Sequence, residues 1–203
     1  ASEIPFEMMV TRRLYAAADA ILVLSEGSRD YLATRGIPRD RIWFVPNGVD
    51  PQEIQPAPES ERPAIRQRLG FSPDRPAILF FGSYHPPNIE AVEFLCETMA
   101  PALKEADFVV AGRVCRALEQ RNLPDNLRVM GAVDEDVKND LLQGCDAAIN
   151  PMFTGSGTNL KMLEYLSAGL PTVTTPRGAR GLELEHRRQA LVVDEERLVQ
   201  GVE

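Results

Sequence analysis

The chain of 203 residues is 44% hydrophobic and 26% charged, which allows an ordinary soluble core in one large domain or a little more. Its formal net charge of −8 argues against non-specific nucleic-acid binding but leaves room for a local anion site. Three cysteines without a CxxC pair indicate a reducing compartment, and no apolar run approaches the ~18 residues of a membrane span. The chain opens with Ala1 and without a signal-peptide pattern, so we expect it to be part of a longer protein.

The first 50 residues are expected to form a small α/β unit. Ser25 is the predicted N-cap of a helix that closes at Gly36, because serine oxygens cap helix starts and glycine tolerates the left-handed conformation at helix ends. Trp43 is expected in the core. The predicted helices are 7–18 and 26–36, and the predicted strands are 19–25 and 40–46.

A proline-rich, charged stretch follows, "PQEIQPAPESERP" at 51–63. Proline keeps such a segment extended and out of helices, so this stretch is the best linker candidate. We therefore expect a remnant of a first domain at 1–50, a linker at 51–63, and a second domain at 64–203.

From residue 76 onward, short apolar runs alternate with amphipathic segments. The first run, "PAILFFG", is typical of a strand buried on both faces, so Phe80 and Phe81 are expected in the core. The alternation favours an α/β fold with a Rossmann-like, doubly wound parallel sheet, whose ligands bind at the carboxyl ends of the strands. The predicted strands are 76–82, 107–112, 126–131, 146–151, 171–175 and 189–194; the predicted helices are 88–105, 134–145 and 158–168, and a polar helix begins near 194.

The stretch "TGSGTNLK" combines glycines with the start of a helix near Thr158. Gly155 and Gly157 permit close approach of a ligand, and the free amides of a helix start suit a phosphate group, to which Lys161 could add a cation. The alternative is a plain helix capped by Thr158 or Ser156, with Lys161 solvated.

Glu164 lies in the second turn of that helix, between apolar neighbours. A carboxylate there needs donors, and the two hydroxyls of a ribose would supply two charge-assisted hydrogen bonds. A phosphate at the helix start and a ribose one turn along would fit one nucleotide. The alternative is an ion pair between Glu164 and Lys161 on an exposed edge.

His85 would either face the cleft or lie in a surface loop beside two prolines, and the loop is expected. His186 is expected at the surface. Arg177 and Arg180 lie beside the same cleft, where they would either attract phosphate or be solvated.

Three stretches, in this order and spacing, resemble family-4 glycosyltransferases with the GT-B fold. "DAILVLSEGSRDYLATRGIPRDRIWFVPNGVD" is similar to the end of their N-terminal domain. "FFGSYHPPNIEAVEFL" and "VMGAVDEDVKNDLLQGCDAAINPMFTGSGTNLKMLEYLSAGLPTVTTPRGARGLE" are similar to their nucleotide-sugar domain. The resemblance covers residues 7–195 and implies a retaining transfer of sugar from a nucleotide sugar, without a required metal.

The resemblance also assigns roles within the donor site. Glu164 matches the second glutamate of the family's Glu-x7-Glu pattern and is therefore the implied ribose ligand. Ser156 stands at the first position, as in a similar variant branch with "GSGT-x-LK-x-LE", and Ser156 and Lys161 are the candidates for a catalytic role.

The remaining donor-site residues follow from the same resemblance. The family's Arg and Lys after the first strand are absent, because Ser83 and Asn88 stand there, and Lys161 or Arg113 is expected to substitute. Amides at 157–160 are expected to face the diphosphate and sugar, and the base is expected against Met130 and Gly131. The predicted donor-binding residues are Gly82, Ser83, Arg113, Met130, Gly131, Gly157, Thr158, Asn159, Leu160, Lys161 and Glu164.

No cofactor is expected, because the nucleotide sugar, linked to UDP or GDP, serves as co-substrate. The expected partners are an acceptor of unknown identity and the missing part of the N-terminal domain of the same protein; no nucleic acid is expected. The resemblance implies polysaccharide biosynthesis in the cytoplasm, with some family members at the inner membrane face. The fragment is expected to bind nucleotide weakly and turn over little.

Two other functions stay open. A sugar-nucleotide epimerase would share the two-domain plan but would need further acidic and histidine residues in the cleft. A degenerate, non-catalytic nucleotide-binding or scaffold module would account for the loss of glutamate at Ser156. A phosphorylase is disfavoured, since no setting for a pyridoxal phosphate lysine is visible.

Overall fold

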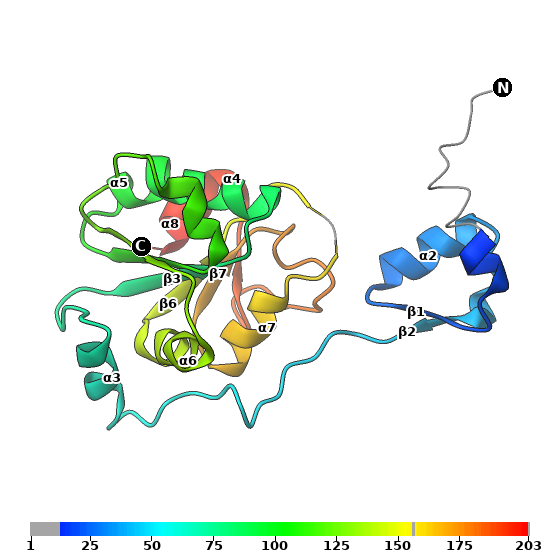
Figure 1. The fold of residues 1–203 in the computed structure, drawn as a ribbon, viewed down its shortest axis with the longest axis horizontal. Helices are drawn as coiled ribbons and strands as arrows, with labels where there is room; N and C mark the ends of the chain where they lie inside the picture. Colours follow the sequence, from blue (N-terminus) through cyan, green and yellow to red (C-terminus); the bar gives the residue numbers. More distant parts are fainter. Residues whose placement is uncertain (1–12, 156, 203) are drawn as a thin grey trace. The chain divides into compact units, whose positions relative to one another are not determined.

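A computed structural model describes residues 13–155 and 157–202. The chain divides into two compact units between Asn47 and Gly48 (Figure 1). Within the described residues, no helix has the length and apolarity needed to cross a lipid bilayer.

The first unit is built on two parallel strands, β1 (Ile21–Val23) and β2 (Ile42–Phe44), which pair in register from Ile21 and Ile42. The helix α2 (Glu26–Thr34) packs on them, and a short 3-10 turn, η1 (Arg39–Arg41), precedes β2. Residues 13–17 are helical, which agrees with the end of the helix predicted at 7–18; its first part lies outside the described residues.

Both predicted ends of α2 are confirmed. The Ser25 hydroxyl accepts a hydrogen bond from the Ser28 amide at 3.1 Å. Gly36 follows the helix with a φ of 86°, and the Ile37 amide donates to the Leu32 carbonyl at 3.2 Å. This pair of features is the usual glycine-closed helix end. The prediction for Trp43 is wrong, because its side chain faces solvent.

The second unit contains a six-stranded sheet, all parallel, in the order β5-β4-β3-β6-β7-β8. This topology confirms the doubly wound α/β fold. The strands are β3 (Ala77–Phe81), β4 (Asp107–Ala111), β5 (Leu127–Gly131), β6 (Ala147–Asn150), β7 (Thr172–Thr174) and β8 (Leu191–Val192). The helices are α3 (Arg62–Arg68), α4 (Pro86–Phe94), α5 (Ala100–Ala102), α6 (Glu135–Gly144), α7 (Leu160–Ser167) and α8 (Leu198–Val202).

Helices cover both faces of this sheet (Figure 1). On one face, α4 and α8 enclose a core around Phe80, Phe108 and Val110. On the other face, α3, α6 and α7 enclose a second core that includes Leu79. Because β3 alternates its side chains between two covered faces, it reads as a continuous apolar run in the sequence.

Two short helical segments depart from the predicted elements. The helix predicted at 88–105 is interrupted by a π-helical turn, η2 (Leu95–Met99), between α4 and α5. A 3-10 helix, η3 (Arg113–Leu118), follows β4, where no helix was predicted. At the end of the second unit, η4 (Glu195–Arg197) leads into α8, in agreement with the helix predicted to begin near 194. Such short turns lack the periodicity that reveals longer helices.

The proline-rich stretch predicted as a linker packs against the second unit. The Ser167 hydroxyl donates to the Ile54 carbonyl, and the Gln143 amide donates to the Gln55 carbonyl at 3.1 Å. Its last residues enter α3, with a proline in the first turn. The high proline content suggested a linker, but a proline in the first turn of a helix is compatible with helical structure.

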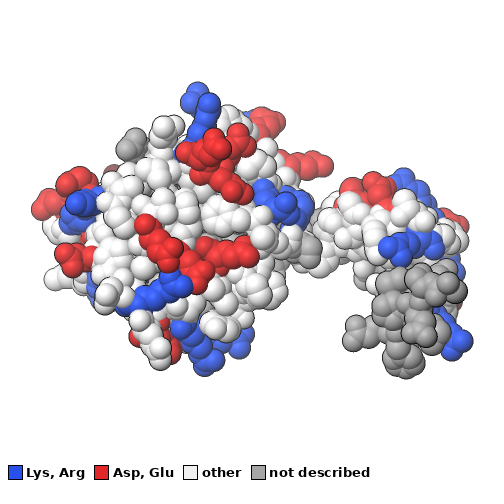
Figure 2. Space-filling model, turned by 90° about the horizontal axis from the view of Figure 1, so that it is seen from above, with Lys and Arg blue, Asp and Glu red and all other residues white. Residues whose placement is uncertain are grey.

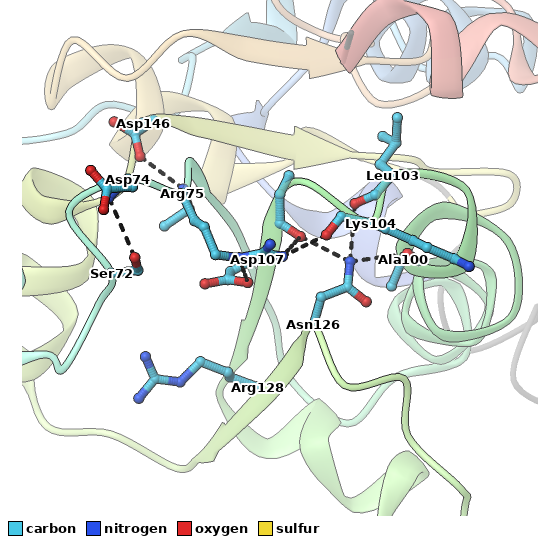
Figure 3. A network of polar contacts seen from close by, with 12 residues as sticks. Ser72, Asp74, Arg75, Ala100, Leu103, Lys104, Asp107, Asn126, Arg128 and Asp146 are labelled. Atoms are coloured by element: carbon cyan, nitrogen blue, oxygen red, sulfur yellow. Dashed lines mark hydrogen bonds and ion pairs between the residues drawn. The ribbon is translucent and has the colours of Figure 1, made fainter.

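Polar side chains close the amino end of the sheet (Figure 3). The Asn126 amide nitrogen donates to three carbonyls, those of Ala100, Leu103 and Ala106, at 2.8–3.0 Å. Nearby, the Arg75 guanidinium contacts the Asp107 carboxylate at 2.8 Å. The Asn126 side chain thus ties the end of the α4–α5 segment to the start of β4 through backbone carbonyls.

Acidic and basic side chains are interspersed over the face of the second unit that Figure 2 shows. The net charge of the chain therefore says little about any single site, and the charge of a cleft must be derived from its own residues.

Candidate functional site

A cleft of about 400 Å³ opens at the carboxyl ends of β3 and β4 and the start of α7. The chain leaves β3 for β4 and β5 on one side and then returns to β6 on the other, so β3 and β6 flank the topological switch point. Ligands of doubly wound folds bind at this kind of crevice. Its polar and glycine lining includes Gly82, Ser83, Asn88, Lys138, Thr158, Asn159, Lys161 and Glu164, and Leu160 also lines it.

Glycine backbones form the wall of the cleft at the strand ends. Gly112 has a φ of 95°, and a Cβ built on it would lie 2.4 Å from the Gly82 carbonyl oxygen. The Gly112 amide donates to the Gly131 carbonyl at 2.7 Å, which joins the ends of β4 and β5. Because only glycine permits this close approach of backbones, these positions keep the strand ends free of side chains.

The helix α7 begins at Leu160, two residues later than predicted, and its N-cap is Asn159 rather than Thr158. The Asn159 side chain does not cap the helix; it donates to the Gly178 carbonyl at 3.1 Å. The first amides of a helix carry partial positive charge. The start of α7 therefore presents a backbone site of positive potential to the cleft.

Lys161 is a buried lysine at this helix start. It is 9% exposed, and its Nζ donates to the Asn88 Oδ1 at 2.7 Å and lies 4.1 Å from the centroid of the Phe80 ring. Burial lowers the pKa of Lys161 to about 7, against an opposing effect of the Glu164 charge. The alternative of a solvated Lys161 is therefore wrong.

Glu164 forms an ion pair with Lys138 of α6, at 3.0 Å between Oε1 and Nζ. Their side chains are 22% and 19% exposed, so both are largely removed from water. The alternative pairing with Lys161 is wrong. Sequence reasoning missed Lys138, although it precedes the buried Leu141 and Leu142 by one turn. A lysine on the apolar face of an amphipathic helix was the available signal.

The connection between β7 and β8 contacts the loop before α7 that contains Gly155 and Gly157. The Arg180 guanidinium donates to the Gly155 and Gly157 carbonyls, both at 2.9 Å, and Arg177 donates more weakly to Gly155 at 3.5 Å. Arg180 is thus not simply solvated, because its guanidinium holds this loop in place. Gly157 is not among the residues that line the cleft.

Ser156 lies outside the described residues. His85 and His186 are both exposed, as predicted for surface loops.

The residues predicted to hold a base line a second hollow of about 450 Å³ at the ends of β4 and β5. Arg113, Met130 and Gly131 are found there, and Gly112 lines both hollows. The structure therefore does not bring Arg113 to the cleft that holds Lys161.

A larger hollow, of about 860 Å³, lies at the amino ends of β3, β6 and β7. Its described lining is mostly apolar and includes no carboxylate, and its cations are Arg187 and Arg188. Size alone would favour this hollow, but the chemistry of a polar ligand site gathers at the switch point.

The parallel sheet covered on both faces, with a helix start, a cation and an acid at its switch point, defines a Rossmann-like ligand-binding domain. Residues 75–203 match the family described as Glycosyl transferases group 1, and residues 4–53 match Glycosyltransferase Family 4. The chain therefore belongs to the group 1 glycosyl transferases, as the resemblance of its sequence predicted.

Curated relatives are longer than this chain. A D-inositol 3-phosphate glycosyltransferase of Xylanimonas cellulosilytica is 33% identical over 104 residues, which are 49% of this chain and 24% of the relative. A mannosylfructose-phosphate synthase of Agrobacterium fabrum is 22% identical over 198 residues, which are 89% of this chain and 43% of the relative. The chain thus spans less than half the length of these relatives.

Solved structures share the fold. Anabaena HepE, crystallised with UDP and glucose, superposes with a TM-score of 0.71 at 15% identity, over 90% of this chain and 52% of HepE. A sucrose-phosphate synthase of Thermosynechococcus elongatus gives a TM-score of 0.74 at 18% identity, over 96% of this chain and 50% of the synthase. These likenesses support a Rossmann-like half of a GT-B fold.

Proposed function

We propose that this chain is the donor-binding part of a retaining glycosyltransferase that moves a sugar from a UDP- or GDP-linked donor to an acceptor, without a metal cofactor. One observation carries the proposal: the start of α7, Lys161 and Glu164 line a single cleft at the switch point of the sheet. The helix start and the cation suit a diphosphate, and the acid one turn later suits the hydroxyls of a ribose.

The two neighbouring hollows support the placement of a whole nucleotide. Because Gly112 lines both, a ligand that lies over this glycine would reach from the Lys161 cleft to the hollow lined by Met130 and Gly131. The diphosphate and ribose would occupy the first hollow and the base the second. HepE, which shares the fold, has been crystallised with UDP and with UDP-glucose.

Catalysis in this proposal is positioning plus electrostatics. The bond between the sugar and the diphosphate breaks with charge building on the leaving phosphate, and the α7 amides and Lys161 would stabilise that charge. Ser156 replaces the glutamate that the family resemblance implies at this place, so contacts to the sugar would differ from those of members with two glutamates.

The first unit is proposed to be part of the acceptor domain. Leu22 and Trp43 are cross-strand neighbours on β1 and β2, and they are 68% and 61% exposed. Parallel strands are normally covered on both faces, so this apolar face would pack against a further part of the same domain. A chain without that part is expected to bind nucleotide but to turn over little.

The test is a titration of the chain with UDP, GDP and ADP, followed by thermal unfolding. A nucleotide at 100 times its dissociation constant stabilises the folded state by about 2.7 kcal/mol. We expect a shift with UDP or GDP that Glu164→Ala abolishes and that the exposed control Glu105→Ala retains. No shift with any nucleotide would instead support a scaffold without donor binding.

Hydrolysis of a labelled nucleotide sugar then tests the transfer chemistry. The full-length protein is expected to release free sugar slowly and nucleoside diphosphate with it, and anomeric analysis of a transfer product would test retention. Inversion at the anomeric carbon would contradict the retaining mechanism but not the donor site.

A further inference from the structure

Lys138 reaches the cleft from α6, a helix to which no role in the donor site has been assigned. Its Nζ lies 3.0 Å from the Glu164 Oε1 and 2.6 Å from the Glu135 Oε2. Lys138 itself lines the cleft, together with Glu164. The contact therefore lies inside the cleft and not on a remote surface.

The pair is arranged asymmetrically on the Glu164 carboxylate. Lys138 contacts Oε1, while Oε2 has no hydrogen-bond partner within the described part of the chain. A carboxylate has acceptor sites on both oxygens, so one oxygen anchored by an ammonium leaves the other free to accept. The ammonium also compensates the charge that burial would otherwise penalise.

The surroundings explain why Glu164 needs such an anchor. Its helical neighbour Lys161 donates to Asn88 and lies over Phe80, and so it does not pair with Glu164. A glutamate side chain has three rotatable bonds, and fixing them before a ligand arrives lowers the entropy that binding must overcome.

We propose that Lys138 is a positioning residue that orients Glu164 toward the ribose and thereby makes the donor site prefer ribonucleotides to deoxyribonucleotides. This inference rests on the proposed function. With Lys138 on Oε1, the Glu164 Oε2 accepts from one hydroxyl of the ribose, and the open lone pair of Oε1 accepts from the other. A 2′-deoxyribose supplies only one of these two donors.

The experiment measures the dissociation constants of UDP and 2′-deoxy-UDP, and of GDP and 2′-deoxy-GDP, by isothermal titration of the whole chain. We expect the native chain to bind the ribose form roughly tenfold to a hundredfold more tightly, the range for one hydrogen bond to a charged group. Lys138→Met, which keeps the apolar stem, should lower this ratio to about threefold or less.

The ratio separates positioning from a merely structural role. If Lys138 only joined α6 to α7, then Lys138→Met would weaken both nucleotides equally and leave the ratio unchanged, which would overturn the proposal. Lys104→Met serves as the matched control, since Lys104 is an exposed lysine that does not line the cleft, and it should leave both constants unchanged.

A double-mutant cycle tests the route through Glu164. In the Glu164→Gln background, Lys138→Met should change the ratio no further, because a positioning residue acts only through the group it positions. Lys138→Arg should restore part of the ratio, because arginine can also donate to the carboxylate, and this variant keeps the test open if Lys138→Met unfolds.

The outcomes distinguish this inference from the proposed function. A native chain that binds no nucleotide would overturn both. A native chain that binds nucleotide but does not distinguish ribose from deoxyribose would remove the ribose role of Glu164, and with it this inference. Discrimination that Lys138→Met leaves intact would overturn only the inference.

Discussion

Two ion-pair clusters lie at opposite ends of the second sheet, and they use the same chemistry for different purposes. At the amino end, the Asp146 carboxylate binds Arg62 and Arg66 at 2.8 and 2.6 Å and also accepts from the Ala77 amide at 2.8 Å. At the carboxyl end, Glu164 binds one lysine through one oxygen and lines a cleft. The first cluster is saturated by its own chain, whereas the second retains capacity for a ligand.

The amino-end cluster has a structural role, because all of its polar groups contact the chain itself. Arg66 donates in addition to the carbonyls of Gly144, Ser72 and Arg75, at 2.7–2.9 Å. One guanidinium thus closes the end of α6 and the turn before β3 at the same time. A partly buried ion pair therefore indicates a ligand site only where an acceptor oxygen is left over and a cleft reaches it.

Gly112→Ala is expected to have the largest effect, because it places a side chain in the wall of the cleft at the carboxyl end of the sheet. The new Cβ would meet the Gly82 carbonyl in a backbone conformation that alanine rarely adopts. We expect a loss of about 4 kcal/mol in the free energy of unfolding and loss of nucleotide binding. Urea unfolding measures the first; Gly201→Ala, whose Cβ would meet only side chains, should cost clearly less.

Arg66→Met disrupts the ion-pair cluster at the amino end of the sheet. It strips the partly exposed Asp146 of one partner and leaves three carbonyls unpaired, so we expect a loss of about 3 kcal/mol in the free energy of unfolding. Nucleotide affinity of the folded fraction should stay within about twofold, since Arg66 does not line the cleft. A large fall in affinity at full folding would show that the two ends are coupled.

Lys161→Met tests the cleft at the carboxyl end of the sheet through the pH dependence of stability. The pKa of Lys161 is lowered by burial to about 7, while an unfolded lysine titrates near 10.4. Between these values the unfolded state binds more protons, so the native chain should gain stability relative to Lys161→Met as pH rises from 7 to 9. We expect roughly 2 kcal/mol, measured by urea unfolding at both values. An equal pH dependence of the two proteins would contradict a buried, shifted lysine.

The smallest expected effect is acid destabilisation through Asp146. Burial would raise the pKa of this carboxyl, but the Ala77 amide, Arg66 and Arg62 outweigh it and hold the pKa below its ordinary value. A lowered pKa contributes stability above the unfolded value near 3.9, which is lost as pH falls through the folded value. Asp146→Asn should therefore make the thermal unfolding midpoint fall less between pH 5 and 3. If the midpoint falls as far in Asp146→Asn as in the native chain, other carboxyls cause the acid destabilisation.

Much of the fold could be predicted because its signals are local. The continuous apolar run of β3 and the cap at Ser25 each depend on residues within a few positions of one another. Trp43 was misplaced because an aromatic residue in a strand indicates burial only when the sheet is covered on both faces.

The sequence by itself determined the order of strands and helices, the glycine approach to α7, and the presence of Lys161 and Glu164 one turn apart. These features follow from periodicity and spacing along one segment. Only the tertiary structure decided the partners: Lys138 for Glu164, Asn88 for Lys161, and a separate hollow for Arg113. The physical reason is that crossover connections bring together side chains from α4, α6 and α7, and no local pattern encodes which of them will meet.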